Sequence, residues 1–272
     1  VLPDWRLDDL MISFSVPGGG VGPHIDQYDV FIIQGMGSRR WRVGDKLPMR
    51  QFCPHPALLH VDPFPPIIDE DLEPGDILYI PPGFPHDGVT HETALNYSVG
   101  FRGPNGRDLI SSFADYVLEN DLGGEHYSDP DLTCREHPGR VEEYELERLR
   151  NMMIDMIRQP EDFKQWFGSF VTTPRHELDI APAEPAYEEA EVVDALLGGE
   201  KLSRLSGLRV LHIGDSFFVH SEQLDTTDAG ALDALCRYTS LGQEELGSGL
   251  KNPAFVSELT RLINQGYWYF EE

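Results

Sequence analysis

The stretch GPHIDQYDVFIIQGMGSRRWRV, residues 22–43, places a histidine and an aspartate, His24 and Asp26, at the start of an apolar, strand-like run. In a strand, side chains at positions i and i+2 project from the same face, so these two are expected to point together. The pair alone gives weak support for a metal site, because an HxD triplet occurs by chance in many proteins. It becomes informative only together with a further metal-binding side chain.

A second histidine, His86, ends the segment GDILYIPPGFPH, residues 75–86. This segment predicts a buried strand, a proline–glycine turn and the start of the next strand. Two imidazoles and one carboxylate form the facial triad that binds Fe(II) and leaves coordination positions open. The alternative is a set of separately hydrogen-bonded histidines near a sheet edge, and the two segments together make it the weaker one. We therefore predict that His24, Asp26 and His86 are metal ligands.

An arginine pair follows on what we predict to be the next strand. Strand alternation places Arg39 on the same face as Trp41 and opposite to Arg40. A guanidinium inside a small barrel needs an anionic partner, because an isolated buried charge is costly. A dicarboxylate co-substrate would supply that partner, and Ser13 in MISFSV could add a hydroxyl group. The alternative is that Arg39 faces solvent.

The organisation of the chain changes near residue 105. Short β-branched and aromatic runs separated by glycine and proline fill residues 10–103, where we count six or seven strands of an antiparallel sandwich or barrel. Helical periodicity follows to about residue 172. The Pro- and Glu-rich stretch 180–191 predicts a linker. The remainder, with a hairpin turn at Gly214–Asp215, predicts a small winged-helix-like module.

Charge is the most extreme feature of the composition, with 47 acidic and 21 basic side chains and a net charge of −26. Such a surface repels nucleic-acid phosphates and anionic membranes and attracts basic partners, although solubility or salt adaptation would explain it as well. A winged helix that binds DNA needs lysine and arginine on its recognition face. The predicted C-terminal module is acidic, so we expect no DNA binding.

The sequence predicts a cytoplasmic location. No run of eighteen apolar residues predicts a membrane span, and the first residues lack the pattern of a secretory signal. Three scattered cysteines, Cys53, Cys134 and Cys236, favour a reducing compartment over a disulfide framework.

The HxD triplet, the arginine on a later strand and the histidine of PPGFPH resemble the Jumonji-C (JmjC) 2-oxoglutarate oxygenases of the cupin superfamily. Longer phrases resemble one branch, the bacterial ribosomal oxygenases, which hydroxylate an arginine of ribosomal large-subunit protein sixteen. The resemblance runs through the whole chain, and the phrases that carry it include LPDW, MISFSVPGGGVGPHIDQYDVFIIQG, LEPGDILYIPPGFPH, FKQWFG, RHELDIAPAEP and GYWYF.

The resemblance implies an α+β fold in three parts. These are a JmjC double-stranded β-helix, or jelly roll, over residues 1–104, a helical dimerisation region over 105–179, and a linker with an acidic winged-helix-like domain over 180–272. Members of this branch carry a substantial segment before LPDW, so we expect upstream strands to be lacking from the β-helix.

The resemblance also implies roles for individual residues. Fe(II) would be bound by the three predicted ligands, and the distal carboxylate of 2-oxoglutarate would be held by Arg39 and Ser13. Asn96 is a further candidate for the wall of the co-substrate site. With O2 as oxidant, the implied activity is hydroxylation of an arginine in a basic ribosomal protein by a homodimeric enzyme.

Three alternatives remain open. The target could be another amino-acid residue or a nucleoside, the triad could belong to a Zn or Mn cupin isomerase or hydrolase that uses no 2-oxoglutarate, or the chain could be a non-catalytic scaffold.

Overall fold

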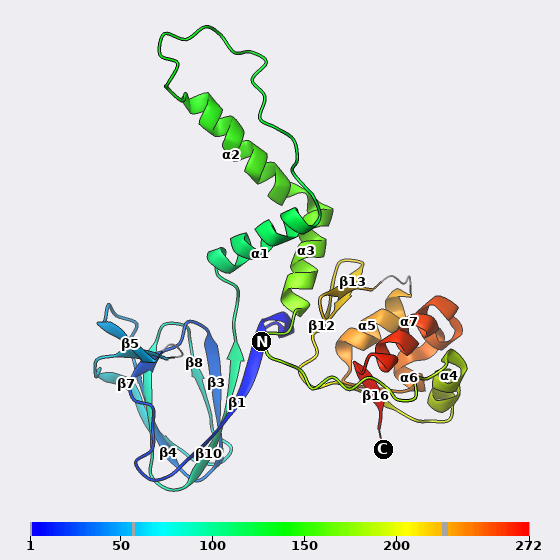
Figure 1. The fold of residues 1–272 in the computed structure, drawn as a ribbon. Coiled ribbons are helices and arrows are strands. Elements are labelled where there is room, and N and C mark those ends of the chain that lie inside the picture. The colour runs from blue at the N-terminus through cyan, green and yellow to red at the C-terminus, as the bar shows by residue number, and fades with distance from the viewer. Residues whose placement is uncertain (1, 56–57, 225–227, 272) are drawn as a thin grey trace. The chain divides into compact units, whose positions relative to one another are not determined.

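The computed structural model describes residues 2–55, 58–224 and 228–271, and the chain divides into two compact units, Val1–Asn105 and Gly106–Glu272 (Figure 1). The first unit is built from strands, and the second begins with the first α-helix. Among the helices that the structure describes, none is both long enough and apolar enough to span a bilayer.

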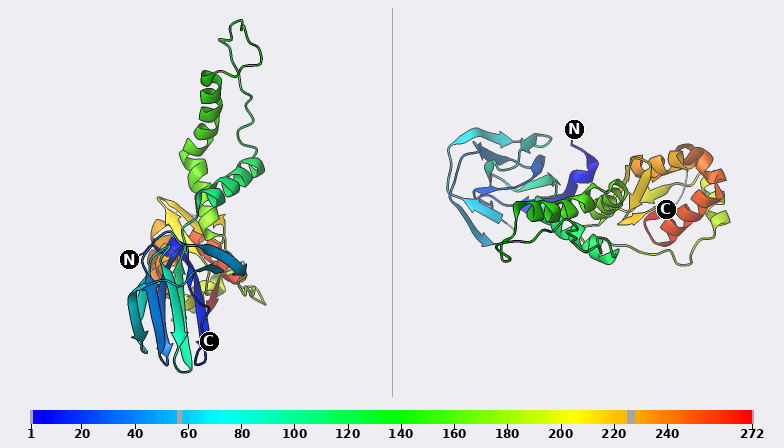
Figure 2. Two further views of the ribbon diagram at one scale, coloured as in Figure 1. Left: turned by 90° about the vertical axis from the view of Figure 1, so that its left-hand side faces the viewer. Right: turned by 90° about the horizontal axis from the view of Figure 1, so that it is seen from above.

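The N-terminal unit consists of two sheets, preceded by the short helix η1 (Asp4–Arg6). The strands of each sheet run side by side in the views of Figure 2. Sheet A has the order β1 (Leu7–Ser15), β10 (Ala94–Phe101), β3 (Asp29–Met36), β8 (Ile77–Ile80). Sheet B has the order β5 (Gln51–His55), β6 (Leu58–Val61), β2 (His24–Ile25), β9 (Pro85–Thr90), β4 (Arg39–Gly44), β7 (Pro66–Leu72).

The two sheets pack face to face through alternating residues of their strands. On β3 the inward positions Val30 and Ile32 are buried, and they share one hydrophobic cluster with Trp41 and Val43 of β4 in the other sheet. All strand pairs recorded in the two sheets are antiparallel. This arrangement confirms the predicted jelly roll.

Two details of the strand prediction are wrong. The strand of His24 ends at Ile25, and the turn after Asp26 moves the chain from sheet B into β3 of sheet A, so Arg39 on β4 is not on the next strand. The structure also has ten strands within the described part of residues 2–105, more than the six or seven predicted. The additional strands include the two-residue β2, which is too short to produce an alternating pattern.

The outer face of sheet A differs from its inner face because it exposes large apolar side chains. On β1, Leu10, Ile12 and Phe14 are each more than half exposed. Ile77 on β8 continues this face.

The second unit begins with three helices and continues into a small mixed α/β assembly. The first three helices are α1 (Gly106–Glu119), α2 (Glu143–Arg158) and α3 (Pro160–Thr172). The remaining helices are α4 (Glu189–Leu197), α5 (Ala229–Arg237), α6 (Gln243–Leu246), η2 (Gly247–Lys251) and α7 (Pro253–Asn264). The strands form two sheets, β15 (Ser240–Leu241), β11 (Leu202–Arg204), β16 (Trp268–Phe270) and β12 (Val210–Ile213), β13 (Ser216–Val219), β14 (Glu222–Gln223).

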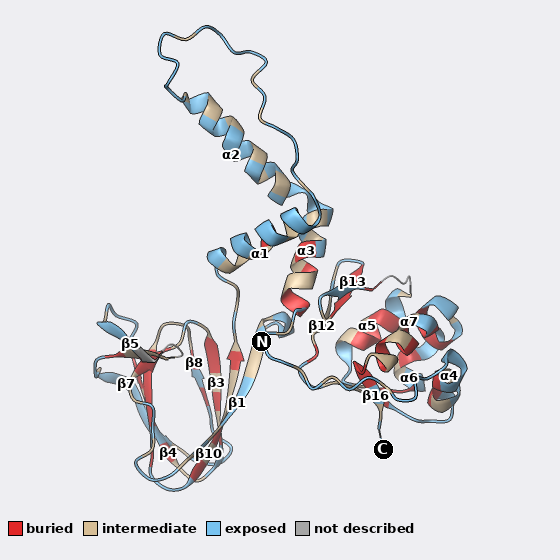
Figure 3. Ribbon diagram, in the orientation of Figure 1, coloured by how far each residue is buried: buried red, intermediate tan, exposed pale blue. Residues whose placement is uncertain are grey.

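The core of this assembly lies along α5 and α7, where the buried residues of Figure 3 concentrate. The predicted hairpin turn at Gly214–Asp215 joins β12 to β13. Helix α3 packs against the same hairpin, since a Cβ added to Gly168 would meet the ring of Phe218 at 2.4 Å. The predicted division of this unit into 105–179 and 180–272 stays a prediction.

Candidate metal and co-substrate site

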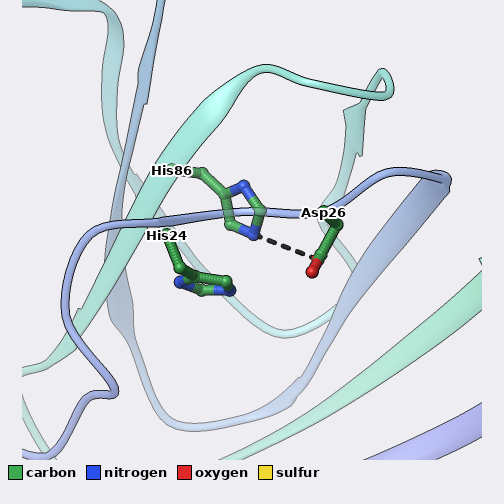
Figure 4. A group of neighbouring side chains, drawn as sticks. All are labelled: His24, Asp26 and His86. Atoms are coloured by element: carbon green, nitrogen blue, oxygen red, sulfur yellow. Dashed lines mark ion pairs between the residues drawn. The ribbon is translucent and has the colours of Figure 1, made fainter. Parts of the chain in front are cut away.

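The three predicted metal ligands lie together between the two sheets. His24 on β2 and His86 on β9 stand opposite each other in sheet B, with ring centroids 4.1 Å apart. Asp26, just past the end of β2, brings Oδ2 to 3.5 Å from Nε2 of His86 (Figure 4). One ligand atom from each residue lies within 4.8 Å of the others, which confirms that the two segments converge on one point.

Backbone carbonyl groups orient both imidazoles. Nδ1 of His24 lies 2.9 Å from the carbonyl oxygen of Gly22, and Nδ1 of His86 lies 3.1 Å from that of Phe84. Because a carbonyl oxygen only accepts, each Nδ1 must carry the hydrogen. The lone pair on each Nε2 is then available to a metal ion, which is the usual arrangement for histidine ligands.

The local electrostatics favour the protonation states that bind metals. Burial lowers the pKa of His24 below its usual value, and repulsion from His86 lowers it further. Burial alone would raise the pKa of Asp26, but the hydrogen bond and charge of His86 outweigh it, so the pKa of this carboxyl lies below its usual range. Together with the second imidazole, of His86, these two groups match the donor set that non-haem Fe(II) sites use.

Arg39 on β4 is buried, as predicted, with a side chain that lies 4.6 Å over the ring of Trp41. Its neighbour Arg40 points outward to Asp69. Burial lowers the pKa of Arg39, and among the described residues no carboxylate lies within 4 Å of its guanidinium. Such a cation is costly unless an anion joins it, so the site fits a carboxylate ligand.

Two hydrogen-bond donors of this pocket have no partner. Nε of Arg39 and Nε1 of Trp41 are buried, and neither has a hydrogen bond to a described residue. A buried donor without a partner costs about 1–3 kcal/mol. A carboxylate that accepted from Nε of Arg39 would satisfy one of these donors, which is a second reason that an acidic co-substrate fits here.

Gly88 on β9 lets the guanidinium and the indole pack directly against its backbone. It stands opposite Trp41 across the sheet, two positions after His86 and therefore on the same face. A Cβ added at Gly88 would lie 2.8 Å from Nε of Arg39 and 2.9 Å from the indole ring. Any larger residue would therefore displace Arg39 or Trp41 from this position.

The other two predicted co-substrate residues belong to a polar row on sheet A. Ser13 on β1 pairs with Asn96 on β10, and Asn96 pairs with Gln34 on β3, so the three side chains share the inner face. Asn96 is completely buried and Oδ1 accepts from Nη1 of Arg39 at 3.4 Å. The structure therefore brings Asn96 to the arginine, and direct contact of Ser13 or Asn96 with 2-oxoglutarate stays a prediction.

Sequence reasoning assigned no role to Gln34, Trp41 or Gly88. Gln34 could have been found, because it interrupts the apolar phase of Val30 and Ile32 on the inner face of β3. Gly88 carries no comparable signal, since its importance depends on which side chains stand opposite.

The fold is a jelly roll with a His–Asp–His triad on its inner face and, between the same two sheets, a buried arginine without a carboxylate partner among the described residues. These features define the class of cupin-type, 2-oxoglutarate-dependent oxygenases. Comparison with known families agrees. Residues 1–109 match the JmjC domain family, and residues 155–269 match the ROXA-like winged-helix family.

Two relatives that are similar over most of this chain narrow the class of protein. The chain is 63% identical over 270 residues to ribosomal protein uL16 3-hydroxylase of Escherichia coli (strain K12), a match covering 99% of this chain and 72% of that protein. It is 34% identical to a probable ribosomal oxygenase of Haemophilus influenzae, over 66% of this chain and 47% of that protein. The chain belongs to the JmjC ribosomal oxygenase family.

A solved structure of a family member shows ligands of the kind inferred here. The structure of YcfD, a ribosomal oxygenase from Escherichia coli, in complex with cobalt and 2-oxoglutarate superimposes with a TM-score of 0.93 at 60% identity. The match covers 100% of this chain and 72% of that one.

Replacing His24 by alanine should strongly weaken metal binding, because only two of the three protein ligands would remain. We expect Co(II) affinity, measured by calorimetry, to fall by about 100-fold or more. His60 provides a matched control, since it pairs with His24 on β6 but lies outside the ligand cluster. Equal losses in His24→Ala and His60→Ala would contradict the assigned ligand set.

Gly88→Ala should weaken dicarboxylate binding while leaving Co(II) affinity unchanged, because the added methyl group would displace the guanidinium of Arg39 and not the metal ligands. We expect the Kd of 2-oxoglutarate for the Co(II)-loaded protein to rise by about tenfold or more. Gly106→Ala is the control, since nothing lies within 4 Å of a Cβ there. An unchanged Kd in Gly88→Ala would show that the co-substrate binds elsewhere.

Proposed function

We propose that this protein is an Fe(II)- and 2-oxoglutarate-dependent hydroxylase that acts on an arginine side chain of ribosomal large-subunit protein sixteen, uL16. The observation that carries the proposal is the pairing of a His–Asp–His triad with a buried arginine that has no carboxylate within 4 Å in the described part of the chain. The name of the 63% identical relative, ribosomal protein uL16 3-hydroxylase, supports the choice of target.

The bound metal and keto acid supply the oxidising chemistry, in which O2 is consumed, 2-oxoglutarate becomes succinate and CO2, and one oxygen atom enters the target C–H bond. His24, Asp26 and His86 hold the ion through two nitrogens and one oxygen. Arg39 binds the distal carboxylate with charge-assisted hydrogen bonds and so fixes the direction from which the keto acid reaches the ion. Val43 and Trp41, both buried, exclude water from the space between the sheets.

The pocket argues against the other classes of function. A Zn or Mn cupin isomerase or hydrolase would need the triad but not a buried arginine with an unpaired Nε. A scaffold protein would need neither. A different target residue would leave the same pocket, so only the target itself has to be tested separately.

The charge of the chain supports a basic partner. With a net charge of −26, the surface accelerates encounter with a cationic ribosomal protein at low ionic strength and disfavours DNA. We place the protein in the cytoplasm with the ribosome, which agrees with three cysteines that form no disulfide.

We also propose that the protein is a homodimer formed through its helical region. Helix α2 exposes a stripe of Leu146, Leu149, Met153 and Ile157. An apolar groove of about 610 Å³ lies beside this stripe and includes Phe113 of α1. A second copy would bury this surface.

The activity is tested by incubating the iron-loaded protein with uL16, 2-oxoglutarate and O2, followed by mass spectrometry. We expect one oxygen atom on an arginine and an equal amount of succinate. Arg39→Ala should raise the KM for 2-oxoglutarate by about 30-fold or more, since a desolvated charge pair is lost, while Arg40→Ala, at an exposed ion pair, should change it little.

Two results would contradict the assignment. Succinate formation with oxygen on another residue or on a nucleoside would exclude the arginine target. Absence of 2-oxoglutarate turnover under all conditions would exclude the oxygenase.

The dimer is tested with Met153→Glu, which places a charge in the middle of the exposed stripe. We expect a change from dimer to monomer in light scattering, because burying an unpaired carboxylate is unfavourable. Asn151→Glu adds the same charge about 200° around the helix and should leave the dimer intact. A monomeric wild-type protein, or equal effects of both variants, would refute this interface.

A further inference from the structure

Gln34 is a buried polar residue that the proposed chemistry leaves without a role. It lies on the inner face of β3 and is only 1% exposed. Burying a primary amide is unfavourable unless its donors and its acceptor all find partners. The partners of this side chain therefore show what it is suited to do.

The amide nitrogen of Gln34 is fixed by the turn between β3 and β4. Nε2 donates to the carbonyl oxygens of Met36 and Gly37, each at 2.9 Å. Gly37 has a φ of +65°, and a Cβ there would lie 2.2 Å from the carbonyl oxygen of Thr93, so the turn has little freedom to move. Because both carbonyls only accept, the nitrogen of Gln34 must face them, and Oε1 must point the other way.

Oε1 of Gln34 in turn fixes Asn96, its neighbour across the sheet. It accepts a hydrogen bond from Nδ2 of Asn96, which leaves Oδ1 of Asn96 directed at Nη1 of Arg39. If the Asn96 amide were turned over, its NH2 group would face Nη1 of Arg39, and two hydrogen-bond donors would oppose each other. The two backbone carbonyls thus fix the orientation of the Gln34 amide. Gln34 fixes the orientation of Asn96, and Asn96 in turn orients the guanidinium of Arg39.

The guanidinium is held in one orientation by this contact and by a second one. Nη2 of Arg39 donates to the carbonyl oxygen of Gly88 at 3.0 Å. With Nη1 and Nη2 each holding an acceptor, Nε is the guanidinium nitrogen without a hydrogen bond to a described residue, and it remains for a ligand.

We propose that Gln34 is a positioning residue for the co-substrate. Through Asn96 it sets the orientation in which Arg39 meets the distal carboxylate of 2-oxoglutarate. The inference rests on the proposed co-substrate, but not on the identity of the hydroxylated target.

The test measures binding without turnover, by calorimetry on the Co(II)-loaded protein. 2-Oxoglutarate is compared with pyruvate, a keto acid that lacks the distal carboxylate. Gln34→Met removes all three hydrogen bonds at nearly constant volume. We expect the Kd of 2-oxoglutarate to rise about tenfold, as for the loss of one hydrogen bond to a charged group, and the Kd of pyruvate to change less than twofold.

Two further variants separate positioning from a general structural role. Gln34→Glu is expected to be protonated in this buried position, so it keeps an oxygen for Nδ2 of Asn96 and a hydroxyl that donates to one of the two carbonyls. It should retain most of the affinity for 2-oxoglutarate. Ile32→Val shortens a neighbouring inward side chain of the same strand and should leave both Kd values unchanged. If Gln34→Met yields too little folded protein, Gln34→Leu, which removes the same three hydrogen bonds, replaces it in every comparison.

Coupling to the arginine provides the last control. In an Arg39→Ala background, Gln34→Met should cause no further change in the Kd of 2-oxoglutarate, because its effect acts through the guanidinium. Equal weakening of both keto acids, an unchanged Kd for 2-oxoglutarate in Gln34→Met, or the same tenfold effect without Arg39 would overturn the proposal. A loss in Gln34→Glu as large as in Gln34→Met would do so as well.

An unchanged Kd in Gln34→Met alongside a strong effect of Arg39→Ala would refute the role of Gln34 and leave the proposed function intact. An unchanged Kd in Arg39→Ala itself would refute the co-substrate site. The two failures are therefore distinguishable.

Discussion

The N-terminal unit depends on one constraint, a guanidinium that is buried between two sheets with no carboxylate within 4 Å among the described residues. Removing such a charge from water is unfavourable, and two carbonyl-type acceptors on Arg39 offset only part of that cost. The remaining Nε is buried without a hydrogen-bond partner, and the guanidinium lies so close to Gly88 that no Cβ fits there. A protein built only for stability would place an apolar side chain here, so Arg39 is best understood as half of an ion pair that a ligand completes.

The two sheets divide the work of the site between them. Sheet B carries the predicted ligands His24 and His86 on neighbouring strands, and β4 of the same sheet carries Arg39 and Trp41. Sheet A carries none of the three predicted ligands, but its polar row provides a hydrogen bond that holds the arginine. A ligand with a chelating end and a carboxylate end, separated by a short chain, matches this arrangement. Because one sheet binds the ligand and the other orients the binding residue Arg39, the fold can hold both ends of a small molecule at a fixed distance from each other.

The sequence was sufficient to predict the parts of the site that local patterns determine. HxD and PPGFPH identified the triad, and strand alternation identified Arg39 and Trp41 as inward residues. It was not sufficient for features that depend on which strands pair. The move of the chain from β2 into the other sheet after Asp26, and the alignment of Asn96 with Gln34, are products of register between distant segments. Gly88 and Gln34 acquire their proposed functions only through that register, because alternation along β3 indicates that Gln34 faces inward but not that it lies next to Asn96.

In the proposed site, the distal carboxylate of 2-oxoglutarate completes the ion pair of Arg39. A crystal structure of this protein with Co(II) and 2-oxoglutarate tests it most directly. We expect the distal carboxylate to accept a hydrogen bond from Nε of Arg39 beside Gly88. The keto-acid end should bind the ion that His24, Asp26 and His86 hold. A structure in which the co-substrate lies elsewhere while Nε of Arg39 stays unpaired would contradict it.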